Sequence, residues 1–291
     1  MDRTIHFIAG LPRSGSTLLC NVLAQNPRFH TTSTSGIIGI VRMVHEQWGG
    51  IFGVNDEVSQ ATQRRALAAI LHCYHDDPTV LKPVVFDKSR GWLGNLNLAE
   101  AALGRKVKVL VCVRDLRDVL ASFEKLWRKN AATWAQPHEE QYYLDYQTVE
   151  GRCDVLMRPD QVVGGAYQRL KMALMRGMRD RMFLVEFDKL TAHPRATMEE
   201  IYQFLEEPWF DHDFDHVEQV TTEDDFMHGI PGLHIIRQKI QPMEPQWPKV
   251  LGDAAAKYAP YNNLWLRLTR DLAAAGRPGA ARPPLAPAAR R

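Results

Sequence analysis

The residues Gly10 to Thr17 combine glycine, arginine and hydroxyl side chains between an apolar stretch and the start of an amphipathic segment. Gly10 and Gly15 tolerate backbone conformations that other side chains forbid, so the amide N–H groups that follow can turn inward around an anion. The positive end of the next helix favours the same negative charge. This segment therefore predicts an anion-binding loop between a strand and a helix.

The spacing of Gly10 and Gly15 matches the nucleotide P-loop, but that motif continues with lysine, and here Ser16 and Thr17 follow directly. The lysine that would reach the β- and γ-phosphates is missing. Arg13 instead places a guanidinium inside the loop, and its planar fork suits phosphate or sulfonate oxygens. An ordinary turn between strand and helix remains the alternative interpretation.

Two further cations follow apolar segments that read as buried strands. Lys88 comes after the strand expected at residues 83–87, and Arg114 ends the strand expected at 106–113. Ser122, eight residues after Arg114, falls on the same side of the helix that follows, so the pair can bind a second phosphate. A solvated loop lysine and a helix-capping arginine are the simpler alternatives.

The elements that must position these residues alternate between strands and helices. Strands are expected at 4–10, 83–87, 106–113 and 181–187, and helices at 17–25, 37–48, 56–74, 92–103, 116–128, 160–179, 194–206 and 258–275. This order predicts an α/β fold, a P-loop-like doubly wound parallel sheet with helices on both faces. Residues 31–36 are expected to be a polar loop, and 209–248 an irregular C-terminal cover. Ligands of such sheets bind at the carboxyl ends of the strands, where Arg13, Lys88 and Arg114 should meet.

Length and composition narrow the class of protein. The 291 residues are expected to form one domain at 1–275 and a disordered tail rich in Pro, Ala and Arg at 276–291. Lys and Arg number 36 against 34 acidic residues, a balance that argues against nucleic acid as a partner. No signal peptide, membrane-spanning run or paired cysteine spacing is visible, so we expect a soluble cytoplasmic protein with no membrane contact. Assembly as a homodimer is left open.

The run Pro12-Arg13-Ser14-Gly15-Ser16-Thr17 after an N-terminal strand resembles the 5′-phosphosulfate loop of sulfotransferases that use 3′-phosphoadenosine 5′-phosphosulfate (PAPS), in particular the tyrosylprotein type. The resemblance extends over residues 1 to about 210. Arg114 with Ser122 matches the pair that binds the donor's 3′-phosphate in this family, and Arg117 also matches the tyrosylprotein pattern. Lys88 matches a family lysine, although its neighbours differ.

The resemblance implies site residues and a reaction. Arg13 and Lys88 would be catalytic, with Lys88 acting on the bridging oxygen as the sulfonate leaves. The donor would be held by Arg13, Ser14, Gly15, Ser16, Thr17, Arg114 and Ser122, with Arg237 and Lys239 of the cover folding over its 3′-phosphate end. The co-substrate would be PAPS and the product adenosine 3′,5′-bisphosphate (PAP), and no metal is implied.

The implied acceptor is a hydroxyl group, with a protein or peptide tyrosine as the first expectation. A small-molecule alcohol, phenol or glycan is the alternative, and a P-loop kinase or nucleotide-binding module is a further alternative. Tyrosylprotein sulfotransferases carry a catalytic Glu shortly after the first helix, but residues 30–36 contain no carboxylate. Either the base comes from elsewhere or the acceptor differs. His212, Asp213 and His216 have a spacing that metals use, but we expect them to be surface residues.

Overall fold

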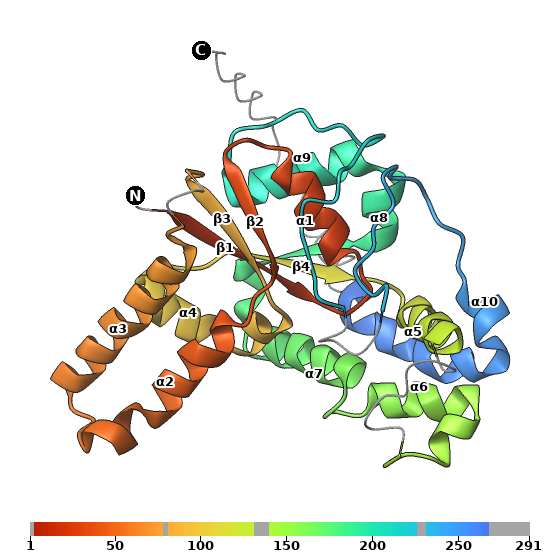
Figure 1. Cartoon of the computed structure of the whole chain (residues 1–291), viewed down its shortest axis with the longest axis horizontal. Helices are drawn as coiled ribbons and strands as arrows, with labels where there is room; N and C mark the ends of the chain where they lie inside the picture. The colour runs from red at the N-terminus through yellow and green to blue at the C-terminus, as the bar shows by residue number, and fades with distance from the viewer. Residues whose placement is uncertain (1–2, 78–80, 131–139, 226–230, 268–291) are drawn as a thin grey trace.

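The computed structural model describes residues 3–77, 81–130, 140–225 and 231–267. Within these ranges, five parallel strands form one sheet in the order β2-β3-β1-β4-β5 (Figure 1). The strands are β1 (Thr4–Gly10), β2 (Phe29–Thr34), β3 (Val84–Lys88), β4 (Val109–Val113) and β5 (Met182–Glu186). The parallel α/β fold expected from the sequence is confirmed.

Helices cover both faces of the sheet, with α1 and α9 on one face and α4 and α7 on the other (Figure 1). The helices are α1 (Ser16–Ala24), α2 (Ile37–Phe52), α3 (Glu57–His75), α4 (Leu96–Leu103), α5 (Leu116–Asn130), α6 (Val149–Met157), α7 (Val162–Met175), α8 (Phe187–Ala192), α9 (Pro194–Leu205) and α10 (Trp247–Val250). Short 3-10 helices are η1 (Arg90–Gly94), η2 (Asp145–Gln147), η3 (Met178–Arg181) and η4 (Gly252–Asn262). The antiparallel pair α2 and α3 extends from one corner of the molecule.

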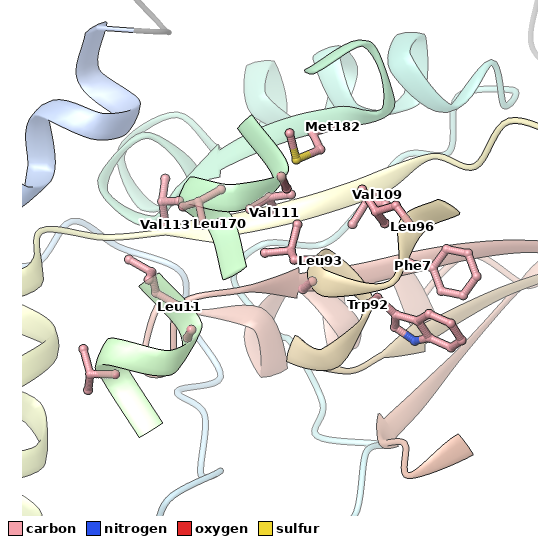
Figure 2. Packing of buried hydrophobic residues seen from close by; sticks show 14 of the residues in the cluster. Phe7, Leu11, Trp92, Leu93, Leu96, Val109, Val111, Val113, Leu170 and Met182 are labelled. Carbon is pink, nitrogen blue, oxygen red and sulfur yellow. The ribbon is translucent and has the colours of Figure 1, made fainter. Parts of the chain in front are cut away.

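Successive side chains of the central strands enter different halves of the core. Phe7 packs against Trp92, and Val111 lies in the same half of the core, covered by α4 and α7 (Figure 2). Ile8 and Leu110 pack in the half under α1 and α9. Both strands are therefore buried on both faces, which is why they read as continuous apolar runs in the sequence. This burial fixes the sheet that carries the candidate site.

Some elements differ from the sequence-based expectation. Residues 29–34 form the edge strand β2 beside β3, where we expected a polar loop; their threonines are β-branched and suit a half-exposed strand. The helix expected at 92–103 is divided at Asn95 into η1 and α4. The helix expected at 258–275 begins as η4, and its end lies outside the described residues, as does the tail at 276–291.

The strand order brings three carboxyl ends side by side. β1 lies between β3 and β4, with Ile8 in register with Lys88 and Gly10 in register with Cys112. The loop after β1, the end of β3 and the segment after β4 therefore share one edge of the sheet. This is the edge where open α/β sheets bind ligands.

Candidate functional site

The loop after β1 passes unusually close to its neighbours. Gly10 has φ 123°, and a Cβ there would lie 2.1 Å from the carbonyl oxygen of Cys112. Gly15 has φ 87°, and a Cβ there would lie 2.7 Å from Cδ2 of Phe187. The buried Ser14 hydroxyl donates to the Cys112 carbonyl at 3.0 Å, so this side chain fastens the loop to β4. Only glycine fits the two turning points of this loop.

Two arginines meet above the loop. Nε of Arg13 donates to Oγ of Ser122 at 3.0 Å, and Nη1 of Arg114 donates to the carbonyl oxygen of Arg13 at 3.4 Å. The Arg114 guanidinium lies 4.3 Å from the ring centroid of Phe187. The structure thus brings together Arg13, Arg114 and Ser122 as expected from their positions after β1 and β4.

The environment of these two arginines favours a bound anion. Burial, and then the charge of Arg114, lowers the pKa of Arg13, while burial lowers the pKa of Arg114. Neither guanidinium forms an ion pair within the described ranges, and the buried Nε of Arg114 has no hydrogen-bond partner there. An oxyanion bound between the two guanidinium groups would offset their mutual repulsion and supply hydrogen-bond acceptors in place of the water lost on burial.

Lys88 is held by a carboxylate that the sequence did not reveal. Its Nζ pairs with Oε1 of Glu223 and lies 3.4 Å from Oγ1 of Thr17. Glu223 also accepts hydrogen bonds from the backbone N–H and the hydroxyl of Thr34, at 2.9 and 3.1 Å. Burial opposes ionisation of Glu223, but the hydrogen bond and charge of Lys88, together with His234 and the Thr34 hydroxyl, lower the pKa of the carboxyl. Glu223 therefore supplies, at the end of β2, the negative charge that residues 30–36 lack.

A histidine and an aspartate accompany this ion pair. Nδ1 of His234 lies 2.6 Å from Oδ1 of Asp225, and His234 lines the same cavity as Lys88. Burial lowers the pKa of His234, while Asp225 and Glu223 act in the opposite direction. The imidazole is consequently neutral near pH 7. Neither Glu223 nor His234 carried a motif in the sequence, because both belong to the irregular cover.

The cavity at this edge has a volume of about 710 Å³. The expected site residues that line it are Arg13, Gly15, Ser16, Thr17, Lys88, Arg114, Arg237 and Lys239. Ser14 and Ser122 act beside it through the contacts given above. Lys239 also pairs with Asp215 at 2.8 Å, on the exposed side of the cover. The cavity extends past the loop to η1 and α7, where Arg90 and Arg169 line it without having been expected from the sequence.

Of the residues with metal-like spacing, His212 is buried in the fold, although we expected it at the surface. Nε2 of His212 lies 3.0 Å from Oη of Tyr202, and burial lowers the pKa of His212 to about 4. Asp213 and His216 pair with each other on the surface. In the described part of the chain, no group of three or more His, Cys, Asp or Glu residues is arranged to hold a metal ion. Among the described helices, none has the length and apolar character required to cross a membrane.

Comparison with protein families identifies the class. The model of the Sulfotransferase family matches residues 6–211, and the chain belongs to this family. The matched range contains the loop after β1, Lys88, Arg114 and Ser122. It ends before the cover that carries Glu223. Comparison with curated proteins gives no match.

Solved structures share the fold at low identity. A mouse sulfotransferase, SULT7A1 complexed with PAP, has a TM-score of 0.50 and 11% identity, covering 93% of this chain and 85% of that one. A sulfotransferase from Alicyclobacillus acidocaldarius has a TM-score of 0.48 and 17% identity, covering 95% and 100% of the two chains. A retinol dehydratase in complex with androsterone and the inactive cofactor PAP has a TM-score of 0.45 and 14% identity, covering 94% and 81%. The tyrosylprotein subclass stays a prediction.

Proposed function

We propose that the protein transfers a sulfonate group from PAPS to an acceptor hydroxyl. The observation that carries this proposal is the pair Arg13 and Arg114, desolvated and without an ion pair in the described ranges, above a glycine-bracketed loop. The mouse sulfotransferase of the same fold is complexed with PAP, the product that such a donor leaves. Family membership supports the transfer of sulfonate rather than phosphate.

The donor would lie along the carboxyl edge of the sheet. The backbone amides of Ser14 to Thr17, at the start of α1, suit the 5′-phosphosulfate. Arg13 would contact the sulfonate, and Arg114 with Ser122 would hold the 3′-phosphate, giving the buried Nε of Arg114 a partner. Arg237 and Lys239 of the cover would close over this end. We propose no metal in the reaction.

The transfer itself needs positioned charge. The acceptor oxygen attacks sulfur in line with the leaving group, the new S–O bond forms, and the electrons of the old S–O bond pass to the bridging oxygen of the 5′-phosphate. Lys88 and Arg13 would stabilise the charge that develops there. The acceptor proton would pass to His234, because its imidazole is neutral and Asp225 fixes its orientation through Nδ1.

Two acceptor classes follow from this site. A protein or peptide tyrosine is the first, by the resemblance of the loop to the tyrosylprotein type. A small alcohol, phenol or glycan is the second; a cavity of about 710 Å³ walled partly by helices has the size of small-molecule sites. Incubation with labelled PAPS and either a tyrosine peptide or a metabolite extract separates the two by showing which becomes sulfated.

The donor is tested by thermal shift with two ligands. PAP should raise the unfolding temperature, because a ligand at about 100 times its Kd stabilises the folded state by about 2.7 kcal/mol. ATP with Mg²⁺ should have little effect, since the loop lacks the P-loop lysine. Stabilisation by ATP with Mg²⁺ alone would refute the proposal and favour a kinase or nucleotide-binding module.

A further inference from the structure

The side of the cavity formed by η1 and α7 carries two arginines that the proposed donor position leaves without a role. Arg90 begins η1, two residues after Lys88, and Arg169 lies on α7, which packs against η1. Both line the cavity. Residues of α6 and α7, among them Leu156 and Val162, add apolar surface on this side.

These two arginines differ from a third arginine that lines the same cavity. Arg152 donates to both carboxylate oxygens of Glu124, at 2.8 Å, so it is paired with a carboxylate within the fold. Neither Arg90 nor Arg169 forms an ion pair with any residue in the described ranges. Within the described ranges, neither positive charge is therefore paired directly with a carboxylate, although the charge of Glu223 acts on Arg90 from a distance.

Burial makes this arrangement costly for the free protein. Nε of Arg169 is buried and has no hydrogen-bond partner among the described residues. Burial lowers the pKa of Arg169, and burial followed by the charge of Arg169 lowers the pKa of Arg90. An oxyanion placed between the guanidinium groups would supply hydrogen-bond acceptors and cancel the repulsion.

The pair belongs to other elements than the residues assigned to the donor's 3′-phosphate. Arg114 and Arg237, assigned to the 3′-phosphate end, follow β4 or belong to the cover, whereas Arg90 and Arg169 belong to η1 and α7. Arg90 nevertheless lies within electrostatic reach of Glu223, the partner of Lys88. An anion bound by Arg90 and Arg169 would thus lie near the point of sulfonate transfer, on the side left for the acceptor.

We propose that Arg90 and Arg169 bind an acidic group of the acceptor, so that the substrate is a hydroxyl compound carrying a carboxylate, sulfate or phosphate. This inference rests on the proposed sulfotransferase function. The acidic group takes no part in bond making: it binds the two guanidinium groups and orients the hydroxyl toward the sulfonate. Substrates without a negative charge would leave both arginines desolvated and unpaired.

The test measures binding to the protein saturated with PAP, and so does not depend on turnover. Calorimetry compares 3-(4-hydroxyphenyl)propanoate with 4-ethylphenol, which lacks the carboxylate but keeps the phenol. We expect the acid to bind about 10- to 100-fold more tightly, the range of a charge-assisted hydrogen-bonded pair. In Arg169→Gln this advantage should fall to a few-fold, with the Kd of PAP unchanged.

Lys171→Gln is the matched control, because it removes one positive charge from the exposed face of the same helix. It should keep the full preference for the acid. Arg90→Gln gives a second, independent variant and should lose the preference as Arg169→Gln does. Acetate and inorganic sulfate, added to the PAP-saturated protein, test the subsite without the phenol and distinguish carboxylate from sulfate; thermal stabilisation relative to chloride should disappear in both variants.

The outcomes separate the two proposals. Failure of the wild-type protein to bind PAP would refute the sulfotransferase function. With PAP bound, the anionic-acceptor inference is overturned if wild type shows no preference for the acid and no stabilisation by acetate or sulfate. It is also overturned if both arginine variants keep the preference, or if they lose PAP affinity instead, which would assign the pair to the donor.

Discussion

The proposed donor side of the cavity, at Arg13 and Arg114, and the proposed acceptor side, at Arg90 and Arg169, are built differently. On the donor side, Arg13 lies in the loop after β1 and Arg114 comes directly after β4. They are held by Ser122, a backbone carbonyl and the ring of Phe187. On the acceptor side, the two arginines belong to η1 and α7, elements of the covering layer. In the proposed function, the strand ends would fix where the donor lies, whereas the covering helices would decide which acceptor fits beside it. Such a division would allow one fold to serve different acceptors.

The groups between the two sides are expected to act on turnover, and the substitution of His234 should have the largest effect. His234→Asn should lower kcat by about 10²- to 10⁴-fold, the usual contribution of a general base. A base works only when deprotonated, and burial lowers the pKa of His234 from its ordinary value near 6.5. Wild-type kcat should therefore be constant near pH 7 and fall only in more acidic solution, about tenfold per pH unit below that lowered pKa.

The pH–rate profile and PAP titration check this assignment. His216→Asn is the control, because His216 pairs with Asp213 on the surface and should leave kcat unchanged. If His234→Asn keeps the fall of kcat at acidic pH, or keeps the wild-type kcat, His234 takes no part in the reaction. The cavity would then have no reacting group at this position between the two sides.

The substitution of Lys88 should have the second largest effect on turnover. It should also lower stability, and one additional substitution separates the two effects. Lys88→Ala should lower kcat by about 10²- to 10³-fold, because the charge on the leaving oxygen loses its cation. It should also lower the free energy of unfolding by about 3 kcal/mol, since Glu223 loses the lysine of a buried pair. The Kd of PAP should change little.

Adding Glu223→Gln to Lys88→Ala should restore most of the stability without restoring turnover. Chemical denaturation and steady-state kinetics measure the two effects on the same protein. Recovery of turnover in the double variant would mean that Lys88 serves the fold and has no part in the transfer.

Of the three substituted residues, Arg114 should have the smallest effect. The effect should be limited to the affinity for the donor. Arg114→Gln should weaken PAP binding by about 10- to 100-fold by removing a charge-assisted bond to the 3′-phosphate. Binding of AMP, which has no 3′-phosphate, should change much less. Arg117→Gln is the matched control, because Arg117 is paired with Asp115 and lies 4.2 Å from the ring centroid of Trp247.

Calorimetry with PAP and AMP distinguishes the two arginines. If Arg114→Gln weakens the binding of PAP and of AMP equally, Arg114 does not contact the 3′-phosphate. A loss of preference for acidic acceptors in that variant would contradict the separation of donor and acceptor sides.

A feature could be predicted from the sequence when the residues that form it lie close together in the chain. The loop from Gly10 to Thr17 could be read from the sequence because its glycines and donors are consecutive. Arg114 and Ser122 lie on one strand–helix unit, so their spacing placed them together. The edge strand β2 was missed because it is polar and half exposed, and its strand character depends on pairing with β3.

The remaining site residues depend on contacts between distant segments. Glu223 is 135 residues from Lys88 in the chain, in a cover with no regular periodicity. Arg169 reads as an ordinary arginine of an amphipathic helix, and nothing local shows that α7 turns it toward η1. A pattern of spacing describes neighbours within one element, but it contains no information about which side chains a different element brings near.

The sequence by itself determined the parallel sheet, the glycine-bracketed loop and the three cations after strand ends, because buried strands and glycine turns are encoded by consecutive residues. Only the tertiary structure decided that Glu223 pairs with Lys88, that His234 joins them, and that Arg90 and Arg169 face the same cavity with no carboxylate partner in the described ranges. The physical reason is that charge compensation inside a protein depends on distance in space. Whether a buried arginine is structural or binds a ligand is therefore settled only by its three-dimensional neighbours.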